Sequence, residues 1–98
     1  MEFLVRISIR WPPAGDETSK AELVAAERSR ARELADEGLI IRLWRIPGRW
    51  ENVGIWRAAN ATELHEAISS LPLYPWFDVS VTALAAHPND PGERQPGR

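Results

Sequence analysis

A predicted β-hairpin over residues 39–56 constrains this chain most, because two runs of β-branched and aromatic residues flank a Pro-Gly pair. Pro47 presets φ for the first central position of a turn, and Gly48 supplies the positive φ that a type II turn needs next. The hairpin carries three of the five tryptophans and several arginines. Aromatic rings beside guanidinium groups would suit a flat anionic ligand, and a half-buried sheet with solvated arginines is the simpler alternative.

Alternation along the two strands predicts two faces for this hairpin. The largely aliphatic face is expected to meet helices, and it comprises Leu39, Ile41, Leu43, Arg45, Glu51, Val53 and Ile55. The aromatic and polar face comprises Ile40, Arg42, Trp44, Ile46, Trp50, Asn52, Gly54 and Trp56. Because an aromatic surface of this size is rarely left in water, we expect the second face to pack against the sheet of another subunit.

Ahead of the hairpin, the period of the apolar residues changes from two to about 3.6. Residues 2–11 alternate as a strand with one apolar face, and two prolines end it. Residues 17–37 then have helical composition, and Thr18 or Ser19 can cap the start of this helix. Glu27 falls near the middle of the apolar stripe of the helix, where an acidic group needs a partner or a purpose.

After the hairpin, a short helix is expected over residues 60–70 and a last strand over residues 77–83. The order strand, helix, strand, strand, helix, strand predicts the α+β, ferredoxin-like βαββαβ fold, with a four-stranded antiparallel sheet and two helices on one face. Residues 1–88 are predicted to form this single domain. Residues 89–98, rich in Pro, Gly and charge, are predicted to form a flexible tail.

The composition excludes several classes of function. The net charge is −2, so no nucleic acid or anionic membrane is expected as a partner. No cysteine is present, which rules out disulfides and thiol chemistry, and the two histidines lack further ligands at metal spacing. The N-terminal segment is interrupted by Arg6 and Arg10, so it is neither a signal peptide nor a membrane span, and we expect a cytoplasmic location.

Several short segments, taken in order and spacing, resemble those of the muconolactone Δ-isomerase family over residues 2–89. They are Glu27-Arg28, Leu43-Trp44-Arg45-Ile46 with Gly48, Asn52, Glu63-Leu64-His65, Leu71-Pro72-Leu73-Tyr74-Pro75 with Asp78, and His87-Pro88. The resemblance implies an enzyme that interconverts muconolactone and 3-oxoadipate enol-lactone in catechol degradation through the β-ketoadipate pathway. It also implies no metal or cofactor, and a ring-like homo-oligomer, typically a decamer built from dimers.

The chain departs from the family pattern around the expected pocket. Arg42 stands where many members have His, Trp50 where Tyr is common, and Val53 where an aromatic residue is common. Arg49 replaces a His or Gln, and Val24 stands where some members have a lysine. The resemblance therefore implies the fold and the family but leaves the substrate open.

Moving a ring double bond in muconolactone requires a base, a donor for the developing oxyanion and an anchor for the carboxylate. Glu27 is the candidate base, because burial against the apolar stripe would raise its pKa toward the useful range. Arg45 shares the helix-facing side of the hairpin, so it could stabilise the enolate or clamp the carboxylate. The alternatives are that Lys20, Arg28 or Arg45 merely neutralises Glu27, and that Arg45 pairs with Glu51 across the hairpin.

Further candidates for binding a small anionic lactone lie on the first helix and on the hairpin. They are Arg28, Arg42, Trp44, Trp50 and Asn52. Arg28 borders the apolar stripe, with a solvated position as its alternative. The four hairpin residues belong to the aromatic face, where a role in a subunit interface is the alternative.

Two other functions compete with an isomerase of butenolide acids. One is a cofactor-independent monooxygenase, cyclase or lyase on the same scaffold, which the departures at Arg42 and Trp50 would favour. The other is a non-catalytic binding or assembly protein.

Overall fold

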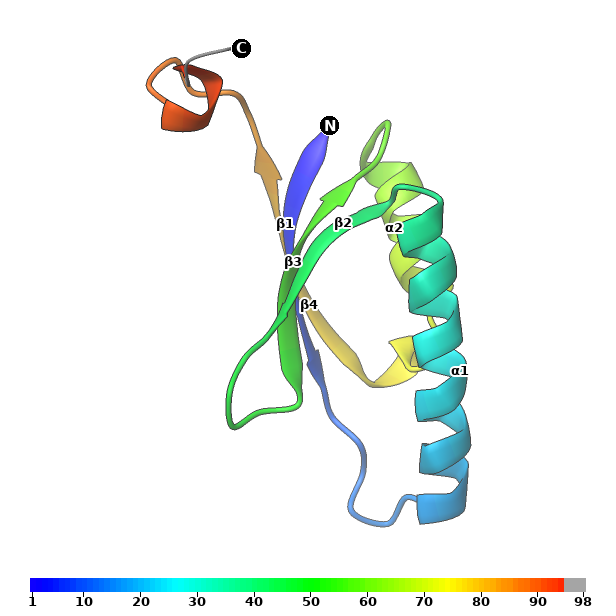
Figure 1. Ribbon diagram of the computed structural model, residues 1–98. Helices are drawn as coiled ribbons and strands as arrows, with labels where there is room; N and C mark the ends of the chain where they lie inside the picture. The colour runs from blue at the N-terminus through cyan, green and yellow to red at the C-terminus, as the bar shows by residue number, and fades with distance from the viewer. Residues whose placement is uncertain (95–98) are drawn as a thin grey trace.

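The computed structural model describes residues 1–94. Its strands are β1 (Glu2–Ile9), β2 (Ile40–Arg45), β3 (Glu51–Arg57) and β4 (Phe77–Leu84), and its helices are α1 (Glu17–Asp36) and α2 (Ala61–Ser69), with 3₁₀ turns η1 (Tyr74–Trp76) and η2 (Pro91–Arg94). The strands form one antiparallel sheet in the order β2-β3-β1-β4, and both helices cover the same face of it (Figure 1). The predicted ferredoxin-like fold is confirmed.

The hydrophobic core lies between the sheet and the two helices. Its buried side chains are Phe3, Val5, Ile7, Leu34, Trp56, Ala58, Leu64, Ala67, Ile68 and Leu71. Phe3, Val5 and Ile7, on the predicted apolar face of β1, are among them. The same alternation places Phe77, Val79 and Val81 of β4 on the helix side, opposite Ile9, Ile7 and Val5.

The face predicted for the second hairpin strand is wrong. Trp56 pairs with Phe3 on one side and with Ile40 on the other, and it is only 1% exposed, in the core. Asn52 likewise lies opposite Ile7 and Arg45, so it faces the helices. A register shift between Ile40 and Arg42 changes the alternation of β2 relative to β3. The alternation within a single strand cannot predict such a shift.

The start of α1 also differs from the expectation. Asp16, rather than Thr18 or Ser19, is the N-cap, and its carboxylate accepts hydrogen bonds from the N–H and the hydroxyl of Ser19 at 3.1 and 2.9 Å. These hydrogen bonds lower the pKa of the Asp16 carboxyl. The helix ends at Asp36 and is followed by Gly38, whose φ of +82° suits a glycine after a helix C-terminus.

The chain beyond β4 runs away from the sheet and the helices (Figure 1). The hydrogen bonds around His87 are local, because the Asn89 N–H donates to its Nδ1 and the Asp90 N–H donates to its carbonyl oxygen, both at 3.0 Å. The domain boundary at residue 88 and the flexibility of the tail stay predictions, and residues 95–98 lie outside the described part. None of the described helices is long and apolar enough to cross a membrane.

Candidate functional site

A cleft of about 340 Å³ lies between α1 and the β2–β3 hairpin. Its α1 wall consists of Val24, Glu27, Arg28 and Ala31, and its sheet wall includes Ile9, Leu43, Arg45, Trp50 and Asn52, with Leu73 also lining it. Six of the seven residues that we predicted for the site therefore line the cleft: Glu27, Arg28, Trp44, Arg45, Trp50 and Asn52.

Glu27 is half-buried on the wall of this cleft. The backbone N–H of Leu73 donates to its Oε1 at 3.0 Å. Burial raises the pKa of the Glu27 carboxyl, and the hydrogen bond from Leu73 opposes that rise. Among the side chains that the structure describes, those of residues 1–92, no basic group forms an ion pair with Glu27. A half-buried carboxylate without a cationic partner is poised to accept a proton.

The segment that holds Glu27 in place was not part of the predicted site. Leu71 and Leu73 are 4% and 1% exposed, and Pro72 stands between them, so the backbone that carries the donating N–H is anchored on both sides. Hydrogen bonding to one carboxylate oxygen orients the group and leaves Oε2 without a hydrogen bond within the described structure. The sequence of the Leu-Pro-Leu-Tyr-Pro segment predicts a rigid apolar connector and resembles the family, but it carries no signal that its backbone meets α1.

The two arginines that line the cleft differ from four other arginines of the chain, which form ion pairs. Arg6, Arg10, Arg30 and Arg57 pair with Glu51, Asp78, Glu33 and Glu2 respectively. Arg28 and Arg45 have no such partner among the described residues. The alternative that Arg45 pairs with Glu51 is wrong, because the Arg6 Nε–H donates to Glu51 Oε2 at 2.7 Å. Two guanidinium groups are therefore available to an anionic ligand in the cleft.

Asn52 contributes an unsatisfied polar atom to the same cleft. Its Oδ1 is buried and has no hydrogen-bond partner in the described structure. A buried polar atom without a partner typically costs about 1–3 kcal/mol. Because Oδ1 accepts and cannot donate, only a ligand group that donates a hydrogen bond to it would offset this cost.

The predicted binding residues of the hairpin lie on both faces of the sheet, not on one face as expected. Trp50 and Asn52 were assigned to the face away from the helices, but both line the cleft. Arg42 and Trp44 do lie on the open face, where the Arg42 guanidinium stacks 4.7 Å from the centre of the Trp44 ring. Trp44 also borders the cleft, whereas Arg42 does not line it. The departure at Arg42 therefore lies outside the cleft.

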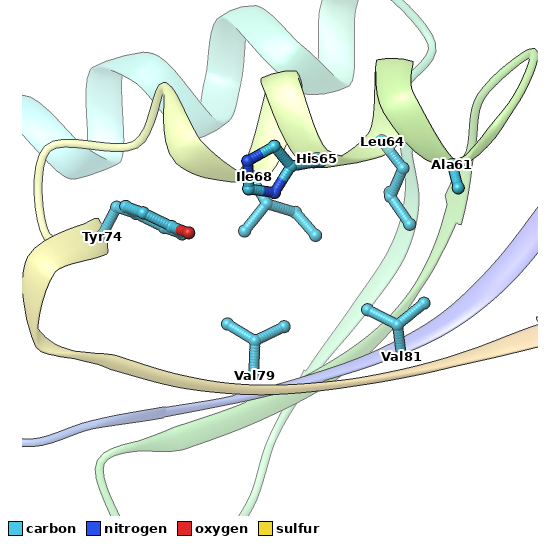
Figure 2. Close-up of a pocket in the computed structure, with 7 residues that line it drawn as sticks. All are labelled: Ala61, Leu64, His65, Ile68, Tyr74, Val79 and Val81. Carbon is cyan, nitrogen blue, oxygen red and sulfur yellow. The ribbon is translucent and has the colours of Figure 1, made fainter.

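A second groove, of about 230 Å³, lies between α2 and β4 (Figure 2). It is lined by Ala61, Leu64, His65, Ile68, Tyr74, Val79 and Val81, and no carboxylate or guanidinium lines it. His65 packs edge-to-face with Tyr74, with ring centroids 6.2 Å apart. This groove lacks the pairing of base and cation that the α1 cleft has. No group of three possible metal-ligating residues occurs in the described part of the chain.

Comparisons with known proteins agree with one another. A family model described as muconolactone delta-isomerase matches residues 1–90. Muconolactone Delta-isomerase 2 of Acinetobacter lwoffii is 36% identical over 87 residues, which is 89% of this chain and 91% of that protein. Muconolactone Delta-isomerase of Rhodococcus opacus is 33% identical over 88 residues, 90% of this chain and 95% of that protein.

The structural comparison extends the match to the fold. A crystal structure of muconolactone isomerase superposes with a TM-score of 0.86 at 32% sequence identity. The superposition covers 92% of this chain and 94% of that one. Sequence and fold therefore match over nearly the same length.

Proposed function

Because the chain belongs to the muconolactone Δ-isomerase family, we propose that it shifts the ring double bond of muconolactone to give 3-oxoadipate enol-lactone, or acts likewise on a related butenolide acid, in the degradation of catechol-type aromatics. The observation that carries the proposal is the half-buried, unpaired carboxylate of Glu27 in a cleft that also holds Arg28 and Arg45. A cytoplasmic location is part of the proposal.

Glu27 acts as the base. Its free Oε2 removes a proton from one ring carbon and returns a proton to the carbon two positions away. One carboxylate serves both steps when the two carbons present the same ring face to it. The Leu73 N–H holds Oε1, so the carboxyl group keeps its orientation while the proton moves. Its raised pKa increases the basicity of the carboxylate toward a weakly acidic carbon.

Arg45 and Asn52 stabilise the intermediate, a dienolate whose negative charge develops on the lactone oxygen. The two residues face each other across β2 and β3, on the side of the sheet that meets α1. Fixed donors at a developing oxyanion lower the barrier because they need little reorganisation during the reaction. Arg28 supplies a second cation on the α1 wall.

The departures from the family pattern at Val24 and Trp50 both line the cleft. They change the apolar and aromatic surface that would contact the substrate ring. The proposal therefore keeps a related butenolide acid as an alternative substrate to muconolactone.

Turnover of muconolactone by the purified protein tests this function, with Arg45→Met as the informative variant. We expect the parent to isomerise muconolactone, and Arg45→Met to lower kcat/KM by about 10²–10³-fold because a donor to the oxyanion is lost. Arg32→Met is the matched control, since Arg32 is an exposed arginine of α1 that does not line the cleft. An inactive parent, or equal effects of the two substitutions, would contradict the proposal.

We further propose that the open face of the sheet joins two copies of this chain, as the building block of a homo-oligomer. Leu4, Trp44 and Leu84 on this face are 37%, 44% and 39% exposed. Leu4→Lys is expected to lower the mass in solution, measured by light scattering, because it places a charge in the apolar contact. Val81→Lys should leave the mass unchanged, since Val81 is 47% exposed on the helix side of the sheet. A monomeric parent would sink this proposal.

A further inference from the structure

Lys20 and Trp50 form a contact at the edge of the cleft, which Trp50 lines and Lys20 does not. The Lys20 Nζ lies 5.0 Å from the centre of the Trp50 ring, and Trp50 lines the cleft. Both side chains are half-buried. Lys20 lies in the first turns of α1, and Trp50 directly precedes β3, at the end of the molecule where the hairpin turns (Figure 1).

Residues of α1 and of the sheet define an inner and an outer end of the cleft. Glu27 follows Lys20 by seven residues, close to two helical turns of about 3.6 residues, so both lie on the same side of α1. The helix rises about 10 Å over those residues. On the sheet, Trp50 lies two residues before Asn52 along the chain, toward the hairpin turn. Glu27, Arg45 and Asn52 thus lie at the inner end of the cleft, and Trp50 lies at its outer end with Lys20 beside it.

Lys20 carries a positive charge that no carboxylate neutralises. Among the side chains of residues 1–92 it forms no ion pair, and the aromatic ring of Trp50 holds its ammonium group without cancelling its charge. The acidic residues that line the cleft are Glu27, at the inner end, and Glu51, which is paired with Arg6. A cation held in place at the rim of a cleft and without an acidic partner favours an anionic group on the ligand.

We propose that Lys20, held over Trp50, binds the carboxylate of the substrate's acetate arm and so makes the cleft selective for lactone acids over neutral lactones. This assignment rests on the proposed function, in which the ring lies between Glu27 and Asn52. The acetate arm of the substrate then points toward the outer end of the cleft. Arg45 does not bind this arm and interacts with the lactone oxygen instead. Lys20 contacts the substrate away from the reacting atoms, so its effect falls on binding rather than on proton transfer.

The test compares muconolactone with its methyl ester, which has the same ring but no negative charge. Lys20→Met is expected to raise KM for the acid by about tenfold to 100-fold, the loss of one charge-assisted hydrogen bond, with kcat within about threefold. The ester should be turned over equally by parent and variant. Lys20→Arg should restore binding of the acid. Arg32→Met, which removes an exposed cation of α1 outside the cleft, should change neither substrate.

A merely structural role of Lys20 predicts a different pattern. If the contact with Trp50 only supports the hairpin, Lys20→Met will impair the acid and the ester by the same factor. That result, or an unchanged KM for the acid, overturns the proposal.

A binding measurement separates this proposal from the proposed reaction. The saturated lactone acid has the ring and the acetate arm of muconolactone but no double bond to move, and calorimetry measures its affinity without turnover. Weaker binding to Lys20→Met supports the anion site even if the parent proves inactive as an isomerase. Equal binding to both proteins overturns the anion site even if the parent is active. Absence of binding to the parent overturns both.

Discussion

Replacing Glu27 by Gln is expected to lower kcat for muconolactone isomerisation by about 10²–10⁴-fold, the usual contribution of a positioned proton-transfer group. Gln keeps the size of the side chain, and its amide oxygen can still accept the Leu73 N–H, but it cannot take a proton from carbon. KM should change far less than kcat, because the substituted atom acts on the reacting carbons. Steady-state kinetics on both proteins provides the measurement.

Two observations accompany this substitution. Glu22→Gln, at an exposed position of α1 outside the cleft, should retain the parent's rate. In the parent, activity is expected to fall as the pH is lowered through the pKa of Glu27, at a higher pH than an exposed glutamate would give, since burial raises that pKa. Full activity of Glu27→Gln would exclude Glu27 as the base.

The raised pKa of Glu27 also has a consequence for stability. The folded protein binds this proton more tightly than the unfolded chain does, so ionised Glu27 weakens the fold once the pH exceeds its folded-state pKa. At neutral pH, Glu27→Gln should therefore have a Tm equal to or above that of the parent. The difference should vanish as the pH falls below the ordinary pKa of a glutamate. A lower Tm at neutral pH would indicate that the substitution damages the fold.

Replacing Trp56 by Ala is expected to lower the free energy of unfolding by about 3–5 kcal/mol, as for other large-to-small substitutions of a buried aromatic residue. Trp56 is 1% exposed and lies between Phe3 and Ile40, so its removal leaves a cavity beneath both helices. Urea unfolding at one protein concentration measures the change, since association would otherwise alter the apparent stability.

Two comparisons sharpen this second prediction. Leu43→Ala removes an apolar side chain that is 48% exposed, and it should cost no more than about 1 kcal/mol. Trp56→Phe should cost less than Trp56→Ala, because it keeps an aromatic ring and removes the indole Nε1, which is buried without a hydrogen-bond partner in the described structure. If Trp56→Ala cost no more than Leu43→Ala, the core position of Trp56 would be contradicted.

Local patterns were enough to predict most elements of the fold. The change in apolar period separated the strands from the helices, and the predicted helix over residues 17–37 differs from α1 by one residue. The same stripe singled out Glu27, because a carboxylate among apolar residues contradicts the pattern of its own helix. Both conclusions depend on residues within a few turns of one another, which is the range that sequence periodicity reports.

The composition of the cleft depended on contacts between distant segments. The backbone donor to Glu27 comes from Leu73, 46 residues away, and the partner of Glu51 comes from Arg6, 45 residues away. Backbone N–H groups are common to all residues but proline, so no side-chain pattern marks Leu73 as a donor. The first contact exists only once the connector after α2 has packed against α1, and the second only once β1 has paired with β3.

By itself, the sequence determined the order of the elements, the position of Glu27 on α1, and the side of β2 that carries Arg45. Only the tertiary structure decided that β3 turns Asn52 and Trp56 toward the helices, and that Trp50 lies beneath Lys20. The physical reason is that alternation divides a strand into two sets of residues but does not say which set faces the core. That choice follows from the register with the neighbouring strands, which here includes the shift between Ile40 and Arg42.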